Sequence, residues 1–205
     1  MKSLLEEYLP AAESTDFAFE KLRFSRFSRF SRFIAATFDR SREEARTSIM
    51  LTSPLKEAGV SFICCSIAAE LAQRGERVLL VDAHALVAAR TLLPLTVASL
   101  CRRVGSHSLW VLGSKEIASF ENTHVRHEEE TCCSILRELE RDFTYVLIDA
   151  PALTAALDAE LLSSAVYGTV LVVRSGSTSG SDLTRAHRRL TAFGGRVLGT
   201  LFNAH

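Results

Sequence analysis

Runs of apolar residues alternate with segments of helical periodicity from about residue 46 onward. Continuous runs rich in Val, Leu and Ile predict buried strands at 47–53, 76–83, 108–114, 144–152, 168–176 and 196–204. Segments of helical pattern, two of which end at glycine, predict helices at 61–75, 129–143, 156–165 and 181–195. Such alternation favours right-handed βαβ units. We therefore expect an α/β fold: a doubly wound, mostly parallel sheet of about six or seven strands with helices on both faces.

The first part of the chain lacks this alternation and contains a short repeat. Residues 20–33 read EKLRFSRFSRFSRF, a repeat of Arg, Phe and Ser. We expect an N-terminal helical arm at 1–45 and the α/β domain at 46–205. The repeat fits an aromatic packing face, a phosphorylation or nucleic-acid contact array, or a simple expansion that lengthens the arm. The expansion is the favoured interpretation.

Composition narrows the function classes. The chain has 205 residues and a formal net charge of zero, which argues against a general nucleic-acid binder. It contains no apolar run of about 18 residues, and its first residues carry acids where a signal peptide has basic ones. We therefore expect a cytoplasmic protein. The five cysteines form no C-x-x-C pair, so small buried residues are expected rather than disulfides or zinc ligands.

Candidate chemistry gathers where the predicted strands end, since ligands of such sheets bind at the carboxyl ends of the strands. The first strand leads through LTSPLKEAGVSF directly into a helix, as an anion-binding loop does. Asp82 ends the second strand and Asp149 a later one. Carboxylates there suit a magnesium ion or the orientation of a nucleophile, although single strand-end aspartates often only cap a turn.

Six stretches of this sequence resemble bacterial tyrosine kinases of capsule and exopolysaccharide synthesis (BY-kinases), which are P-loop proteins related to the MinD/ParA ATPases. The stretch after the first strand resembles their Walker A motif, and VLLVDAH and VLIDAP resemble their two later acidic motifs. DAELL with VYGTVLVVRSGSTS, and RVLGTLFN, resemble the blocks that follow. In the arm, Glu20, Arg23 and Arg26 fit the E-x-x-R-x-x-R helix by which subunits of the family dock into rings. The resemblance extends from about residue 17 to residue 203.

The resemblance implies a P-loop NTPase-like domain and a set of site residues. Gly59, Ser61 and Asn203 would bind nucleotide, the asparagine through adenine. Asp82 and Asp149 would be catalytic, and with Ser61 they would hold Mg²⁺ if nucleotide binds. The implied partners are a membrane polysaccharide co-polymerase that recruits the chain to the inner face of the membrane, and further copies of the chain. No nucleic-acid partner is expected.

The departures from the family pattern concern the phosphate loop and the second motif. Val60 stands at the position of the phosphate-gripping lysine and Phe62 at that of the final threonine. His84 and Leu86 replace the second acid and the arginine of the second motif. A charge-assisted hydrogen bond contributes about 1.5–3 kcal/mol, so losing the lysine weakens ATP binding roughly 10- to 150-fold. We expect weak use of ATP and Mg²⁺, no tightly bound cofactor, and a loop that has decayed into a strand-to-helix connection.

We also expect no cluster of acceptor tyrosines of the kind that the family carries. The chain ends NAH, and its three tyrosines are Tyr8, Tyr145 and Tyr167, the last two within segments predicted to be buried. The leading hypothesis is a regulatory or scaffolding pseudo-kinase of polysaccharide synthesis and export. The alternatives are an active ATP-dependent protein-tyrosine kinase of the same pathway and a MinD/ParA-like positioning ATPase.

Overall fold

A computed structural model of the chain describes residues 47–104, 108–121 and 132–203. The predicted arm at 1–45, with Glu20, Arg23 and Arg26, lies outside these ranges. The boundary between arm and domain therefore remains a prediction.

One seven-stranded sheet forms the centre of the described chain, in the order β3-β4-β2-β5-β1-β6-β7. Its strands are β1 (Ser48–Thr52), β2 (Val78–Asp82), β3 (Arg102–Arg103), β4 (Leu109–Leu112), β5 (Tyr145–Asp149), β6 (Gly168–Arg174) and β7 (Val197–Asn203). All neighbouring pairs run parallel except β3 and β4, which are antiparallel. The six predicted strands and the mostly parallel α/β fold are confirmed.

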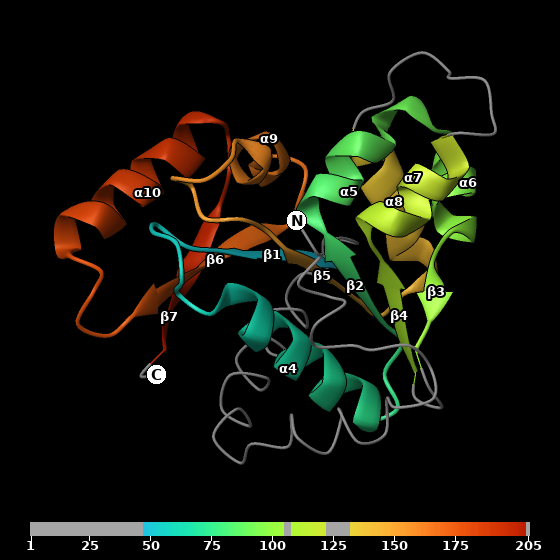
Figure 1. Ribbon diagram of the computed structural model, residues 1–205, viewed down its shortest axis with the longest axis horizontal. Helices are drawn as coiled ribbons and strands as arrows, with labels where there is room; N and C mark the ends of the chain where they lie inside the picture. Colours follow the sequence, from blue (N-terminus) through green and yellow to red (C-terminus); the bar gives the residue numbers. More distant parts are fainter. Residues whose placement is uncertain (1–46, 105–107, 122–131, 204–205) are drawn as a thin grey trace.

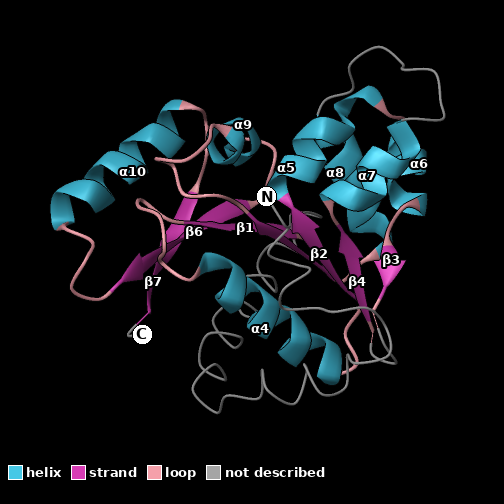
Figure 2. Cartoon of the chain, in the orientation of Figure 1, coloured by secondary structure: helices cyan, strands magenta, loops and turns pink. Residues whose placement is uncertain are grey.

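Helices connect these strands. They are α4 (Val60–Gln73), α5 (Ala83–Ala88), the 3-10 turn η1 (Ala89–Thr91), α6 (Pro94–Ser99), α7 (Ser114–Glu121), α8 (Cys132–Asp142), α9 (Asp158–Ser163) and α10 (Gly180–Ala192). The four predicted helices correspond to α4, α8, α9 and α10. In the described chain α4 covers one face of the sheet, and α5 to α10 lie over the other (Figures 1 and 2).

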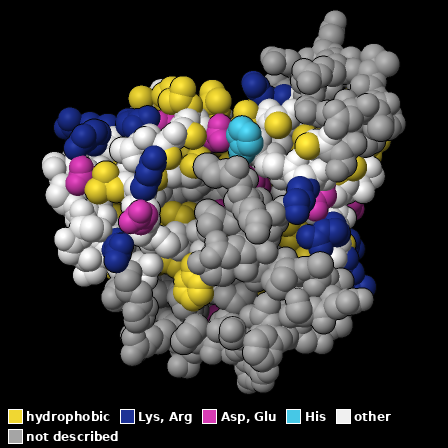
Figure 3. Space-filling model, in the orientation of Figure 1, with side chains coloured by type: hydrophobic (Ala, Val, Ile, Leu, Met, Phe, Trp, Pro, Cys, Tyr) yellow, Lys and Arg dark blue, Asp and Glu magenta, His cyan; other side chains and the backbone are white. Residues whose placement is uncertain are grey.

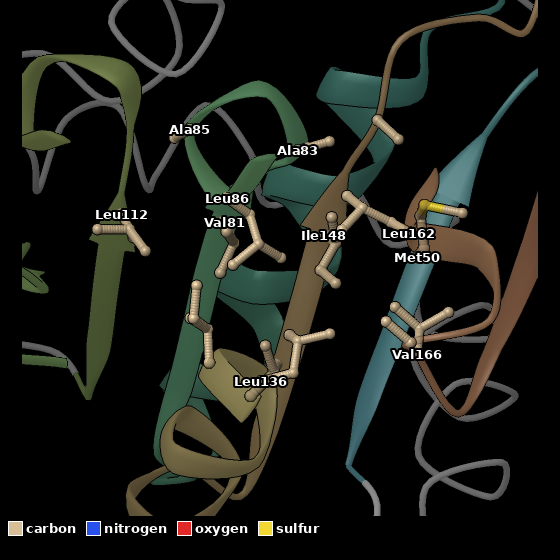
Figure 4. Packing of buried hydrophobic residues seen from close by; sticks show 14 of the residues in the cluster. Met50, Val81, Ala83, Ala85, Leu86, Leu112, Leu136, Ile148, Leu162 and Val166 are labelled. Atoms are coloured by element: carbon tan, nitrogen blue, oxygen red, sulfur yellow. The ribbon is translucent and has the colours of Figure 1, made fainter. Parts of the chain in front are cut away.

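Each face of the sheet packs into its own hydrophobic cluster, because successive side chains of a strand point to opposite faces. In β1, Ile49 and Leu51 pack with α4, whereas Met50 packs on the other side. Figure 4 shows Met50 and Val81 together with Leu136 of α8 and Leu162 of α9 in that second cluster. The strands β2, β5, β1 and β6 are thus buried on both faces, as their continuous apolar runs predict, whereas β3 and much of β7 are exposed or half-buried.

The topology places three chain segments side by side at the middle of the sheet. Strands β2, β5 and β1 are neighbours, so their carboxyl ends meet at one edge although they are far apart in sequence. No helix in the described ranges is both long enough and apolar enough to cross a bilayer.

Candidate nucleotide site

The two strand-end aspartates lie opposite one another. Asp82 of β2 and Asp149 of β5 occupy the same register position, and Asp149 also aligns with Leu51 of β1. The sequence prediction that these two carboxylates share one edge of the sheet is consistent with this register.

The loop after β1 runs alongside the segment after β5. The Thr52 hydroxyl donates to the Pro151 carbonyl oxygen at 2.7 Å, and the Leu153 amide donates to the Ser53 carbonyl oxygen at 2.9 Å. The Ser53 hydroxyl then closes a local turn on the Leu55 carbonyl oxygen at 2.7 Å. These bonds fix the start of the loop and direct it toward the first residue of α4.

Gly59 makes the turn into α4, and Asn203 lies directly against it. The glycine has a φ of 80°, in the left-handed region that favours glycine. A Cβ atom at this position would lie 2.5 Å from Asn203 Nδ2. The same Nδ2 donates a 2.9 Å hydrogen bond to the Ala58 carbonyl oxygen. Asn203, predicted to contact adenine, thus bonds to the backbone of the loop from the end of β7.

The side chains that replace the lysine and threonine of the motif are core contacts. Val60 and Phe62, at the first and third positions of α4, are partly buried and pack with Leu198 against the cluster on the α4 side. Both residues therefore extend the hydrophobic core, and neither brings a charge or a hydroxyl to the mouth of the loop.

Ser61 and Asp149 form the polar centre of the site. Burial raises the pKa of Asp149 to about 7, a hydrogen bond from the Ser61 side chain opposes that rise, and the nearby charge of Asp82 adds to it. A carboxyl with this pKa is about half protonated at neutral pH. A divalent cation would compete with that proton for the same oxygens.

Asp82 has its own set of contacts. Its Oδ1 accepts from the His84 amide at 2.9 Å, and its Oδ2 accepts from the Ser114 hydroxyl at 3.1 Å. The His84 ring lies with Nδ1 3.4 Å from Asp158 Oδ2 at the start of α9, and its side chain is 72% exposed. The position that carries a second acid in the family is therefore a surface imidazole beside a carboxylate.

Sequence reasoning missed Ser114 and Asp158 as contacts of this site. Ser114 begins α7, separated by one residue from the end of β4, so its place beyond a strand end was a usable signal, but a single serine carries little information. Asp158 reaches His84 only because α9 packs against α5.

The cysteines form neither disulfides nor a metal site in the described part of the chain. All five cysteines are free, and burial raises the pKa of the Cys64 and Cys65 thiols. Cys64 and Cys65 are core residues, as predicted, whereas Cys101, Cys132 and Cys133 are half-buried. Within the described ranges, no group of three or more His, Cys, Asp or Glu side chains is arranged to hold a metal ion.

The nucleotide-site residues predicted from sequence therefore form two groups. In one, Ser61 hydrogen-bonds to Asp149, which aligns with Asp82 on the neighbouring strand. In the other, Asn203 lies against Gly59. A cavity of about 30 Å³ adjoins the loop between Leu55, Leu153 and Arg189. It has room for a few water molecules at most.

Comparison with known proteins supports the resemblance to tyrosine kinases. The chain is 26% identical over 173 residues to the tyrosine-protein kinase YwqD of Bacillus subtilis, an alignment that covers 76% of this chain and 71% of the relative. It is 24% identical over 173 residues to the putative tyrosine-protein kinase CapB of Staphylococcus aureus, covering 76% and 74%. No protein-family model matches the chain.

Solved structures share the fold. The VpsO kinase domain superposes with a TM-score of 0.67 at 19% identity, covering 93% of this chain and 97% of that one. MinD of Aquifex aeolicus gives 0.58 at 20% identity, covering 78% and 70%. Cobyrinic acid a,c-diamide synthase of Mycobacterium smegmatis, solved with an ATP analogue and magnesium, gives 0.58 at 18% identity, covering 77% and 74%. The resemblance to bacterial tyrosine kinases and the P-loop NTPase-like fold are confirmed.

Proposed function

We propose that this relative of the bacterial tyrosine kinases is a catalytically impaired pseudo-kinase that regulates or scaffolds exopolysaccharide or capsule synthesis and export. The observation that carries the proposal is the packing of Val60 and Phe62 against the core. In the first turn of α4, the positions that would bind phosphate and metal in an active kinase carry side chains that pack against the core instead.

The contact between Asn203 and the loop supports the same conclusion. This bond uses one of the two N–H donors of the Asn203 amide, at 2.9 Å. A purine that displaced it would leave the buried Ala58 carbonyl oxygen without this partner, which costs about 1–3 kcal/mol. Nucleotide bound in that way would have to offset this loss as well as the missing lysine.

Part of the magnesium chemistry is retained. Ser61, Asp82 and Asp149 supply the hydroxyl and carboxylate oxygens that Mg²⁺ prefers, and they would hold the ion if nucleotide binds. Bound Mg²⁺-ATP would supply a phosphoryl group whose charge the ion partly neutralises. Because Val60 carries no charge, this chain would add less stabilisation to that group than a lysine does.

These retained oxygens favour one alternative, an active ATP-dependent protein-tyrosine kinase of the same pathway. A third function, a MinD/ParA-like positioning ATPase, is supported only by the shared fold. The E-x-x-R-x-x-R pattern of the arm favours the kinase relatives over it.

Calorimetry with Mg²⁺-ATP separates the proposal from the active kinase. We expect a dissociation constant weaker than about 10 µM for the native chain, because a lost charge-assisted contact alone weakens binding roughly 10- to 150-fold. Val60→Lys should tighten binding by about tenfold or more. It should not restore full activity, because His84 and Leu86 also depart from the motif.

Val60→Met is the matched control, since it lengthens the side chain without adding charge. Equal effects of the lysine and methionine variants would show that packing, and not the missing charge, limits binding. Binding by the native chain tighter than about 10 µM, or phosphotyrosine on this protein found by mass spectrometry, would contradict the pseudo-kinase proposal.

The proposed partners are a membrane polysaccharide co-polymerase and further copies of the chain. Glu20, Arg23 and Arg26 stand at i, i+3 and i+6, which would place them along one side of a helix. They would offer one carboxylate and two guanidinium groups to a neighbouring subunit. Such a head-to-tail contact would close into a ring or extend as a filament.

Light scattering tests this assembly. We expect the native chain to form oligomers at micromolar concentration, and the double variant Arg23→Ala, Arg26→Ala to remain monomeric. Arg137→Ala with Arg141→Ala removes the same charge from α8 and should leave assembly intact. A native chain that stays monomeric, with or without a cytoplasmic segment of the membrane partner, would contradict the docking role.

A further inference from the structure

The outer faces of α9 and α10 form a surface that combines arginines with exposed apolar side chains. We call it the α9–α10 surface and define it by Leu157, Leu161, Arg185, Arg188 and Phe193. In Figure 3, Lys and Arg side chains follow α10, and hydrophobic side chains gather over α9 and the adjoining end of α10. Nothing in the candidate nucleotide site uses these residues.

Three large apolar side chains of this surface face solvent. Leu157, Leu161 and Phe193 are 61%, 46% and 50% exposed. Leu157 and Leu161 stand four residues apart and so lie on one side of α9. Phe193 follows α10, and a Cβ at the next residue, Gly194, would lie 3.5 Å from Ser164 Cβ just after α9. The three side chains therefore belong to one region of the surface.

The arginines lie beside this apolar region. Arg185 and Arg188 project from the exposed side of α10, whose buried side carries Ala186 and Leu190. Arg185 pairs with Asp182 of its own helix at 2.9 Å. The Arg188 side chain has no ion pair or hydrogen bond within the described part of the chain. It is the charge most available to an external partner.

The acidic side chains near these arginines do not cancel them. Glu160 is fully buried beneath Arg189, and Asp182 is engaged at the start of α10 with Ser179 and Arg185. Asp158 is turned toward His84. The outermost charges of the surface are therefore the guanidinium groups.

We propose that the α9–α10 surface docks directly onto anionic lipid headgroups. Arginine forks bind phosphate oxygens well, and leucine and phenylalanine side chains can enter the boundary between headgroups and acyl chains. Arg185 and Arg188 line a hollow of about 650 Å³ on the exposed side of α10, and every residue that lines it belongs to this one helix. A hollow formed by a single helix has no second element to hold a peptide in place, whereas a bilayer needs no groove, which favours the bilayer.

This inference does not depend on the proposed pseudo-kinase activity. It adds a direct contact with the membrane to whatever contact a membrane partner makes. A basic residue near an anionic surface strengthens binding about fivefold. This attraction falls off within a Debye length, which shortens as salt rises. Two arginines and three apolar side chains would give weak, reversible attachment that a second contact would reinforce.

Co-sedimentation of the full chain with vesicles tests the proposal. We expect binding to vesicles of phosphatidylcholine and phosphatidylglycerol but much less to phosphatidylcholine alone, with binding that falls as salt rises. Arg185→Ala with Arg188→Ala should lower the affinity by about 30-fold, which corresponds to about 2 kcal/mol. Leu157→Ser with Leu161→Ser should lower it by about tenfold, also at low salt.

Two control variants keep the result specific. Arg137→Ala with Arg141→Ala removes the same charge from α8, and Leu93→Ser with Leu95→Ser removes two exposed leucines from the region of α6; both should bind like the native chain. The N-terminal arm, with its Arg-Phe-Ser repeat, is present in every variant, so the readout is the difference between variants. Circular dichroism checks that each variant is folded.

Three outcomes would overturn the proposal. The native chain could fail to bind anionic vesicles at low salt, or the Arg185 and Arg188 variant could lose no more affinity than its α8 control. Finally, a surface that ignores vesicles but is needed to bind an acidic protein segment would belong to a protein partner instead.

Discussion

Replacing Asp149 by Asn is expected to stabilise the folded chain at pH 8 by about 2–4 kcal/mol and to change little at pH 4. The pKa of Asp149 rises from 3.8 to about 7, mainly because the side chain is buried. At about 1.4 kcal/mol per pH unit, the full difference is roughly 4 kcal/mol, which partial solvent access reduces. Asn keeps the size of the side chain and removes the charge that burial disfavours.

The sign follows from proton binding. Between about pH 4 and 7 the folded chain holds a proton on Asp149 that the unfolded chain has released. The native chain therefore loses stability as the pH rises through this window, and the loss is complete above the folded pKa. Below pH 4 both states are protonated, so the advantage of Asn disappears.

Urea unfolding of both chains at pH 4, 6 and 8 provides the measurement. Asp142→Asn, at the exposed end of α8, removes one carboxylate outside the site and should change stability by less than about 0.5 kcal/mol. If the difference between native chain and Asp149→Asn were the same at all three pH values, the buried-carboxylate explanation would be wrong. Asp82→Asn should act in the same direction as Asp149→Asn but more weakly, because the charge of Asp82 is a smaller cause of the rise.

A buried carboxylate that lowers the stability of the folded chain is typical of a functional position. Asp149 lies in a central strand and accepts a hydrogen bond from Ser61, whereas Val60 and Phe62, the neighbours of Ser61, are partly buried and pack against the core. Under the proposed function, the oxygens that suit Mg²⁺ therefore remain, whereas the charged group that would bind phosphate is missing. Calorimetry of ATP binding with and without Mg²⁺ measures how much the remaining oxygens contribute when the phosphate-binding lysine is missing.

The sequence predicted the architecture well because burial on both faces leaves long apolar runs. It did not predict β3, whose two residues, Arg102 and Arg103, carry no apolar signal and pair only through β4. The short helices α5 and α6 were missed for a similar reason, since six residues barely establish a period. Their positions depend on packing and not on local pattern.

The site was predictable only in part. Strand ends identified Asp82 and Asp149, because parallel strands bring their carboxyl ends together. The hydrogen bond between Asn203 and Ala58 joins residues 145 positions apart, and no local pattern indicates that the asparagine bonds to the loop. The sequence showed that Val60 stands where the family has a lysine. Its packing against the core could be recognised only from the folded structure.

Arg189 of α10 and Glu160 of α9 form an ion pair that is expected to contribute strongly to the stability of the fold. Arg189→Met should lower the free energy of unfolding by about 3 kcal/mol. The Glu160 side chain is fully buried, and its Oε1 accepts from Arg189 Nη2, while its Oε2 has no hydrogen-bond partner within the described residues. Removing the arginine leaves a buried charge unpaired, which typically costs 3–5 kcal/mol. The lower value is expected because Arg189 is 37% exposed and water can approach the gap.

Arg188→Met is the matched control, because Arg188 precedes Arg189 on the same helix and lacks a partner in the described chain. Its effect on urea unfolding should be below about 0.5 kcal/mol. The double variant Glu160→Leu, Arg189→Met should recover most of the lost stability, since an apolar pair of similar volume often replaces a buried ion pair without cost. Equal stability of the Arg188 and Arg189 variants would mean that the pair does not hold α9 to α10. In that case the α9–α10 surface would lack the rigid support that its proposed membrane contact requires.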